Sequence, residues 1–333
     1  MDLLNLNEKL IDKISSFENL YEAFRDCARG KRRSLGYKNF IFSYGEKLKS
    51  IEEELKKTNN YKWSKYRDFY VYDPKKRLIM AAPFKDRVVH TAIHRIVEPL
   101  IDRHLGARSY ACRVGMGNRN AAIRLFKQLE TMGENRYCIK LDVQKYFESI
   151  NHEVLYQRFI RHLPDNTIDE LIKGLIGSHG RFKSLGSGIP IGNLTSQLFA
   201  NFYLSSFDKL ACKFLNIDFY TDEITNNNFY IRYMDDSVIL AKTKEEAFSV
   251  ANKLVEYAKD ELKLNIPNNK KVILANDPIP FLGFVLDSGG YRTLRRNERK
   301  LEKKIKRYDK NNIPHSDIAI VLQSYKAWRQ LMV

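Results

Sequence analysis

The stretch FYIRYMDDSVILAK, from Phe229 to Lys242, places two adjacent acids between two apolar runs. Apolar residues alternate on both sides of the acids, at Phe229, Ile231 and Tyr233 and then at Val238 and Leu240. A period of two around a short polar turn predicts a β-hairpin with Asp235 and Asp236 at its tip. Because adjacent carboxylates repel each other, a site for a divalent metal is favoured over the alternative of a solvated Asp-Asp turn.

A second acidic position, Asp142, lies in RYCIKLDVQKYFESI at residues 136–150. The apolar residues before it alternate at Tyr137, Ile139 and Leu141. We therefore expect Asp142 at the end of a strand, followed by a turn into a helix. A strand-end acid together with Asp235 and Asp236 is the carboxylate set of a two-metal nucleotidyl-transfer site. Acids without His or Cys ligands suit two Mg²⁺ ions, with Mn²⁺ as the alternative.

The composition indicates a polyanionic partner. The 333 residues carry a formal net charge of +17 and are 44% hydrophobic, enough for a sizeable core. The alternative is a merely soluble basic surface. Four cysteines without CxxC spacing favour reduced thiols and a cytoplasmic protein. No apolar run approaches the roughly 18 residues of a membrane span, and the N-terminus is not typical of a signal peptide, so we expect no membrane partner.

Both acidic segments resemble motifs of the reverse transcriptases. YMDD at residues 233–236 is similar to their metal-binding box, and LDVQKYF at residues 141–147 to the block with their first catalytic acid. The resemblance covers nearly the whole chain. It implies RNA-directed DNA synthesis from dNTPs on an RNA template with a DNA or RNA primer. It also implies that Asp142 and Asp235 bind both metals and that Asp236 assists them.

The same resemblance implies a fold and its subdivision. The expected fold is α+β, a right-hand polymerase with fingers, a palm built on an antiparallel sheet, and a small helical thumb. The fingers are expected at residues 1–136 and the palm at 137–285, with 151–199 returning to the fingers. The thumb is expected at 286–333.

Several basic residues are candidates for holding the triphosphate of a dNTP. Residues 66–82 read as two strands around a DPKK turn, and a helix is predicted after Pro83. The resembled family binds the triphosphate with this segment, which points to Arg77, Lys85 and Arg87. Arg and Lys suit phosphate because they donate charge-assisted hydrogen bonds. The alternative is ordinary surface charge.

Three further positions resemble the part of the family's site that holds the sugar and the base pair. Phe147 corresponds to the aromatic residue that excludes a 2′-hydroxyl, with a plain core aromatic as the alternative. Ile191 and Gly192 stand where the family usually has Gln-Gly, and Ser196-Gln197 stands where it has Ser-Pro. Ile191 cannot donate or accept a side-chain hydrogen bond, which puts the fidelity of copying in doubt.

Other segments are predicted to contact nucleic acid or the leaving group. Lys271 is favoured over Lys270 as the donor of a proton to pyrophosphate, with a solvated lysine pair as the alternative. Residues 291–310 are densely basic, with apolar residues at helical spacing. The predicted nucleic-acid contacts are Arg113, Gln197, the primer-grip-like Phe281, Leu282 and Gly283, and Arg295, Arg296, Lys303 and Lys304.

The segment IGNLTSQ, residues 191–197, is similar to reverse transcriptases of diversity-generating retroelements and of some bacterial defence systems. The retroelement type implies error-prone copying with a structured non-coding RNA and a small basic accessory protein. The alternatives are a phage-defence enzyme, which includes untemplated or protein-primed synthesis, RNA-directed RNA synthesis, and a non-catalytic RNA-binding scaffold. The aromatic Phe147 argues against RNA synthesis, and the intact acids Asp142, Asp235 and Asp236 argue against the scaffold.

Overall fold

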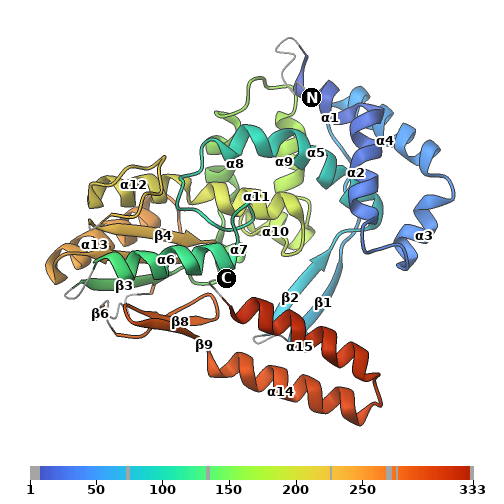
Figure 1. Ribbon diagram of the computed structural model, residues 1–333. Coiled ribbons are helices and arrows are strands. Elements are labelled where there is room, and N and C mark those ends of the chain that lie inside the picture. The colour runs from blue at the N-terminus through green and yellow to red at the C-terminus, as the bar shows by residue number, and fades with distance from the viewer. Residues whose placement is uncertain are drawn as a thin grey trace. The chain divides into compact units, whose positions relative to one another are not determined.

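The computed structural model describes residues 8–72, 76–132, 136–225, 227–267, 272–274 and 277–330 (Figure 1). Their contacts divide the chain into two compact units. The first unit falls within residues 1–105, 144–206 and 258–265, and the second within 106–143, 207–257 and 266–333. Helices and antiparallel strands occur largely in separate runs along the chain, which confirms the predicted α+β class. The boundaries of fingers, palm and thumb remain a prediction.

The described residues of the first unit are mostly helical and include a β-hairpin. Its N-terminal elements are α1 (Leu10–Ser15), α2 (Phe17–Ala28), α3 (Leu35–Ile41), α4 (Tyr44–Thr58), β1 (Arg67–Tyr72), β2 (Lys76–Ala81) and α5 (Phe84–Asp102). Its later elements are α7 (Tyr146–Ser149), α8 (His152–Ile160), α9 (Asp169–Ile176), α10 (Gly180–Leu185) and α11 (Leu194–Tyr203). The antiparallel pairing of β1 with β2 and the helix after Pro83 confirm two of the predicted elements.

Buried polar side chains fix how α5 meets its neighbours. Asp86 is fully buried and accepts hydrogen bonds from Tyr61 Oη at 2.9 Å and from the backbone nitrogen of Ser64 at 2.8 Å. His90 lies one turn further along, with Nδ1 2.7 Å from Thr195 Oγ1 on α11 and Nε2 3.0 Å from Tyr66 Oη. Burial lowers the pKa of His90 to about 3, so the ring is neutral at ordinary pH. These contacts place the start of β1 against α5 and α11.

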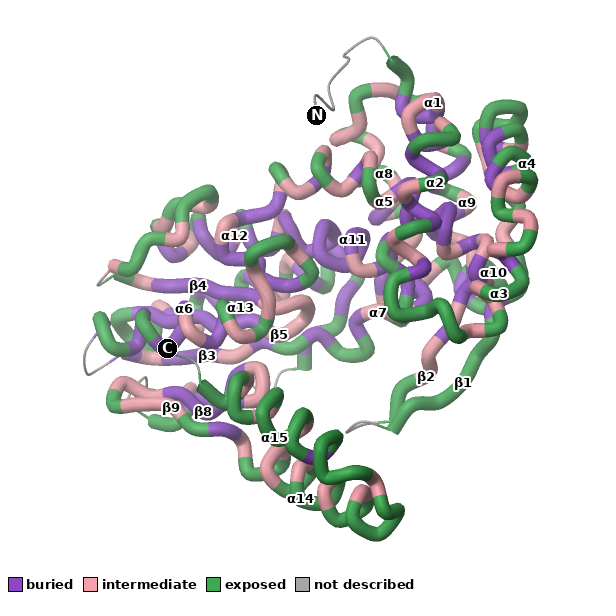
Figure 2. The backbone as a smooth tube through the Cα atoms, turned by 45° about the vertical axis from the view of Figure 1, so that its right-hand side comes forward, coloured by how far each residue is buried: buried purple, intermediate pink, exposed green. Residues whose placement is uncertain are grey.

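The second unit is built on a sheet with the order β4-β5-β3-β6 among its described strands. The strands are β3 (Tyr137–Asp142), β4 (Phe229–Tyr233), β5 (Asp236–Ala241) and β6 (Val272–Leu274), all antiparallel to their neighbours. Three helices precede or follow these strands: α6 (Asn118–Met132), α12 (Ser205–Leu215), which begins at the boundary of the unit, and α13 (Lys244–Asp260), which ends beyond it. A buried apolar cluster joins α6 to one face of this sheet, and Figure 2 shows the buried residues along β4.

A second antiparallel sheet in this unit leads into two helices. Its order is β7-β8-β9 in the described residues, formed by β7 (Ile279–Phe281), β8 (Phe284–Asp287) and β9 (Gly290–Thr293). The helices that follow are α14 (Arg295–Lys310) and α15 (His315–Arg329). The helical spacing seen from residue 291 becomes a helix only at Arg295, because the residues before it pair with β8. Every described residue of α14 is at least partly exposed (Figure 2).

The α14–α15 segment is anchored at its far end. The centroid of the Trp328 ring on α15 lies 4.7 Å from that of the Phe284 ring on β8.

Within the residues that the structure describes, no helix combines the length and the apolar character that a membrane span requires.

Candidate active site

The β4–β5 hairpin has the alternation that the sequence predicts. All five alternating apolar residues pack into or against one cluster with α6, at Phe229, Ile231, Tyr233, Val238 and Leu240. Tyr233 pairs with Asp236, so Met234 and Asp235 alone form the turn. The prediction that both acids lie at the tip is therefore half right: Asp235 is in the turn, but Asp236 is the first residue of β5.

Met234 has a backbone conformation that side chains rarely adopt. Its φ of 57° lies in the left-handed region, as at the first central residue of type II′ turns, where glycine is usual. Such a residue costs roughly 1–3 kcal/mol, which the surrounding structure must offset. Arg232 contributes to this by donating from Nη1 to the carbonyl oxygen of Met234 at 2.8 Å. The turn that presents Asp235 is thus strained and held from within.

Strand register brings the third acid to the same end of the sheet. Asp142 is the last residue of β3, as predicted, and pairs with Asp236 of β5. Directly opposed residues of antiparallel strands place their side chains on the same face. Asp142 is exposed, and Asp235 and Asp236 are half-buried. The backbone thus gathers the three acids that the sequence singles out.

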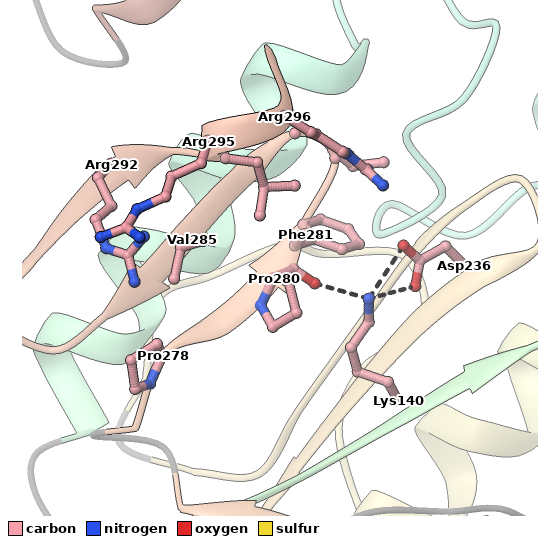
Figure 3. A pocket seen from close by; sticks show the side chains of 12 residues that line it. Lys140, Asp236, Pro278, Pro280, Phe281, Val285, Arg292, Arg295 and Arg296 are labelled. Atoms are coloured by element: carbon pink, nitrogen blue, oxygen red, sulfur yellow. Dashed lines mark hydrogen bonds and ion pairs between the residues drawn. The ribbon is translucent and has the colours of Figure 1, made fainter. Parts of the chain in front are cut away.

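Their side chains do not converge on one point. Among the described residues, no group of three or more His, Cys, Asp or Glu side chains is arranged to hold a metal ion. Asp236 is instead paired with Lys140 of β3, whose Nζ lies 3.1 Å from Oδ1 and 3.3 Å from Oδ2 (Figure 3). Lys140 also donates to the carbonyl oxygen of Pro280 on β7 at 2.7 Å.

Burial and neighbouring charges act on the Asp236 carboxyl in opposite directions. Burial raises the pKa of Asp236, Lys140 lowers it, and the charge of Asp142 raises it again. The buried Oδ1 has an ion-pair contact with Lys140 but accepts no hydrogen bond from the described residues. A divalent cation between Asp142 and Asp235 would offset the repulsion among the acids, and carboxylate oxygens are ligands that Mg²⁺ prefers. The residue types therefore suit Mg²⁺, while their side chains are not gathered around one point in the described structure.

A cavity of about 700 Å³ joins this site to the second sheet of the unit (Figure 3). It is lined by Lys140 and Asp236, by the predicted primer-grip residues Phe281, Leu282 and Gly283, and by Arg292, Arg295 and Arg296. The structure therefore brings five of the predicted nucleic-acid contacts to the same cavity as a predicted catalytic acid. Lys303 and Lys304 lie further along α14 and are exposed.

The β7–β8 turn depends on its glycine. Leu282 and Gly283 both have positive φ, at 49° and 96°, between the paired residues Phe281 and Phe284. A Cβ at Gly283 would lie 3.1 Å from both Asn297 Nδ2 and the Trp328 ring. The turn is thus a close-packed structural feature as well as a predicted contact.

Residues predicted to hold the sugar and the base pair are brought together in the first unit. The backbone nitrogen of Ile189 donates to the carbonyl oxygen of Phe147 at 2.8 Å, and that of Met80 on β2 donates to Ile191 at 3.2 Å. Phe147 and Ile191 are both half-buried. Gly192 has a φ of 124°, and a Cβ there would lie 3.6 Å from the carbonyl oxygen of Met80.

The basic candidates of the first unit differ in how they are engaged. Arg77 is exposed on β2, the strand that bonds to Ile191. Lys85 forms an ion pair with Glu54 at 3.6 Å. The guanidinium of Arg87 lies over the ring of Phe84, 5.4 Å from its centroid.

The structure describes two of the remaining residues predicted to contact nucleic acid or the leaving group, and neither lines the cavity beside Asp236. Arg113 donates to the carbonyl oxygens of Gly106 at 2.8 Å and Ser109 at 3.1 Å, so it holds its own loop together. Gln197 is half-buried on α11. Lys270 and Lys271 lie outside the described residues.

The sequence analysis does not identify two residues that are important to this geometry. Lys140 shares the face of Asp142 because it precedes it by two positions in a strand, and this spacing is a signal that the sequence contains. Arg232 alternates with Phe229 and Ile231 inside an apolar run, which marks it as a buried charge in need of a partner.

Comparison with known proteins agrees with this architecture. The family described as reverse transcriptase (RNA-dependent DNA polymerase) matches residues 56–286. Protein YkfC of Escherichia coli (strain K12) is 26% identical over 268 residues, which cover 71% of this chain and 68% of YkfC. The putative COX1/OXI3 intron 1 protein of Saccharomyces cerevisiae is 22% identical over 177 residues, which cover 51% of this chain and 21% of that protein.

Among solved structures, apo telomerase from Candida Tropicalis matches with a TM-score of 0.51 and 12% identity. The match covers 70% of this chain and about half (49%) of the telomerase chain. This likeness shows the fold, a right-hand polymerase.

The chain belongs to the reverse transcriptase family, whose members are RNA-dependent DNA polymerases and hence nucleotidyltransferases.

Proposed function

We propose that this chain copies an RNA template into DNA by adding dNTPs to a DNA or RNA primer. The observation that carries the proposal is the register of Asp142 with Asp236, with Asp235 in the adjoining two-residue turn. Three acids at one sheet end, beside a cavity rich in Arg, suit a reaction in which phosphate charge develops.

Each acid has a distinct proposed role. Asp142 and Asp235 would hold two Mg²⁺ ions, or Mn²⁺ in their place, and Asp236 would assist. When bound, the metals would lower the pKa of the primer 3′-hydroxyl and stabilise the charge on the leaving pyrophosphate. The hydrogen bond from Arg232 to the carbonyl oxygen of Met234 holds the backbone of the turn that carries Asp235.

The first unit would contribute to dNTP selection. Arg77 is exposed on the strand that bonds to Ile191, and Lys85 and Arg87 lie on the first turn of α5. We assign the triphosphate to these cations and the sugar to Phe147. Within the family, the segment from Ile191 to Gln197 supports the error-prone retroelement type, which works in the cytoplasm with a structured RNA and a small basic accessory protein.

The same segment supports a second candidate, a phage-defence reverse transcriptase with a non-coding RNA template or with untemplated, protein-primed synthesis. The two differ in a measurable property, because only the retroelement type is expected to copy template adenine poorly. DNA attached covalently to a side chain would identify protein priming.

Substitution of Asp235 tests the proposed reaction. Asp235→Asn should lower dNTP incorporation at least about 10³-fold, because it removes a charge that stabilises the transition state. The melting temperature and the binding of RNA should be nearly unchanged, since the residue lies in a turn outside the core. Asp260→Asn, an exposed acid on α13, is the matched control and should retain full activity. Appreciable polymerase activity in an Asp235→Asn, Asp236→Asn double variant would refute the assignment.

A further inference from the structure

The proposed reaction assigns no role to Lys140, which lies at the same end of the sheet as the three acids. It lies on β3, two residues before Asp142, and its side chain is 27% exposed. Its ammonium contacts both carboxylate oxygens of Asp236 and donates to the backbone carbonyl of Pro280. It also lies 5.8 Å from the centroid of the Phe281 ring. One cation thus contacts a predicted catalytic acid and two adjacent residues of the β7–β8 hairpin (Figure 3).

These contacts cross between two separate sheets. Asp236 and Lys140 belong to the β4-β5-β3-β6 sheet, while Pro280 belongs to β7, an edge strand of the β7-β8-β9 sheet. A backbone carbonyl on a strand edge has no ladder partner on that side, so a lysine can satisfy it. The link is therefore directional: it fixes the position of the hairpin backbone, not only that of a side chain.

An ordinary surface ion pair would not have this effect. Exposed pairs contribute little because water and salt screen them. Lys140 and Asp236 are both only about a quarter exposed, at 27% and 28%, and the ammonium has a second, uncharged acceptor. Hydrogen bonds from a charged donor in such a setting are among the stronger ones in proteins.

We propose that Lys140 is a positioning residue that ties Asp236 to the β7–β8 hairpin, so that primer binding and the orientation of the catalytic strand end depend on each other. This inference rests on the proposed function. If the hairpin carries the primer end, its position relative to Asp236 determines where the 3′-hydroxyl lies relative to the acids. Loss of Lys140 would then loosen the primer even when no metal is present.

The test measures primer binding in the metal-free protein. A DNA primer with a recessed 3′ end, annealed to RNA, is titrated with full-length protein in EDTA, and its Kd is read by fluorescence anisotropy. Lys140→Met should weaken binding about tenfold, because it removes a charge-assisted link without changing side-chain length much. Binding of single-stranded RNA of the same sequence should be unchanged. A matched control, Lys242→Met, removes the same charge at the residue that directly follows the other end of β5.

A second variant cuts the same link from the other side. Asp236→Asn should weaken primer–template binding in the same direction and serves if Lys140→Met does not fold. In the double variant, binding should be no weaker than in Lys140→Met alone, because the two residues act through one connection. Hydrogen exchange at the backbone of Phe281 and Phe284 should quicken in Lys140→Met but not in Lys242→Met.

The outcomes separate this inference from the proposed reaction. If Lys140→Met binds the primer–template as well as Lys242→Met does, or if the two substitutions are simply additive, the positioning role is wrong. If the wild-type protein adds no dNTP to the same primer–template with Mg²⁺ or Mn²⁺, the proposed function itself is wrong.

Discussion

The β4–β5 hairpin carries a basic–acidic pair on each of its faces, and the two differ in burial. On one face Arg232 Nη2 lies 2.6 Å from Asp208 Oδ2 of α12, and the side chains are 1% and 3% exposed. On the other face Lys140 lies 3.1 Å from Asp236, and both side chains are about a quarter exposed. The Arg232–Asp208 pair is thus sealed from solvent, whereas the chemically similar Lys140–Asp236 pair is open to it.

The sealed pair is a closed network. Asp208 also accepts from Tyr230 Oη at 2.7 Å, and Arg232 also donates to Ser109 Oγ at 2.9 Å and to the carbonyl of Met234. Its partners are protein groups, so it can hold the turn but is closed to substrate. Asp236 and Lys140 line a cavity instead, where a ligand can reach them. The difference separates charges that build the hairpin from charges that are available for chemistry.

The largest expected effect is on stability, from breaking the sealed pair. Asp208→Ala should lower the free energy of unfolding by about 3–5 kcal/mol, because it leaves the Arg232 guanidinium buried and unpaired. The matched variant Asp236→Ala should lower it by about 1–2 kcal/mol, because Lys140 keeps the carbonyl oxygen of Pro280 as an acceptor and water can reach its ammonium. Urea unfolding of both variants with equal m-values measures the difference. Equal losses of stability in the two variants would show that the contrast between the faces is not energetic.

This contrast also shows what the sequence can and cannot predict. The hairpin, the strand that ends at Asp142 and the helix after Pro83 follow from local periodicity, which needs no knowledge of distant residues. The position of Asp236 within β5 depends on the left-handed φ of Met234, and a methionine gives no local signal for that conformation.

The ion pairs depend on contacts between distant segments. Lys140 is 96 residues from Asp236 and 140 from Pro280 in the sequence. Arg232 can be recognised as a charge inside an apolar run, but its partner on α12 lies 24 residues away. Strand register and helix packing decide such pairings, and periodicity in one segment does not encode them. The candidate acids were therefore predictable from the sequence, whereas the partners of Lys140 and Arg232 were not.

A smaller effect is expected from the exposed cations of α14, two of which line the same cavity as Lys140 and Asp236. Gln replaces four cations in this variant, at Arg295, Arg296, Lys303 and Lys304. The slope of log Kd for RNA against log salt concentration should fall by up to about three, because fewer counterions are released on binding. The control replaces four exposed lysines of similar number and charge, at Lys244, Lys253, Lys259 and Lys263. An unaltered slope in the α14 variant would mean that this helix does not contact the RNA.

The smallest predicted effect concerns Ile191, an aliphatic residue at a position where the resembled family usually has Gln. Its backbone carbonyl is held by Met80 on β2, so a substitution there changes the side chain while the main chain keeps its position. An aliphatic side chain fills space without directional preference, whereas an amide reports whether a nascent base pair is correctly placed. Since one hydrogen bond contributes about 1 kcal/mol, Ile191→Gln should lower the error frequency roughly five- to tenfold.

Deep sequencing of cDNA from one defined RNA template, with the RNA and protein partners supplied, measures this change. The retroelement type predicts the largest improvement opposite template adenine. Leu194→Gln, which introduces the same amide at a residue that is 42% exposed, should leave the error spectrum unaltered. If the wild-type protein copies adenine as faithfully as the other bases, the defence type replaces the retroelement type. If the wild-type protein is error-prone and Ile191→Gln does not change the spectrum, discrimination resides in another contact with the dNTP, and Arg77, exposed on the strand that holds Ile191, becomes the residue to substitute.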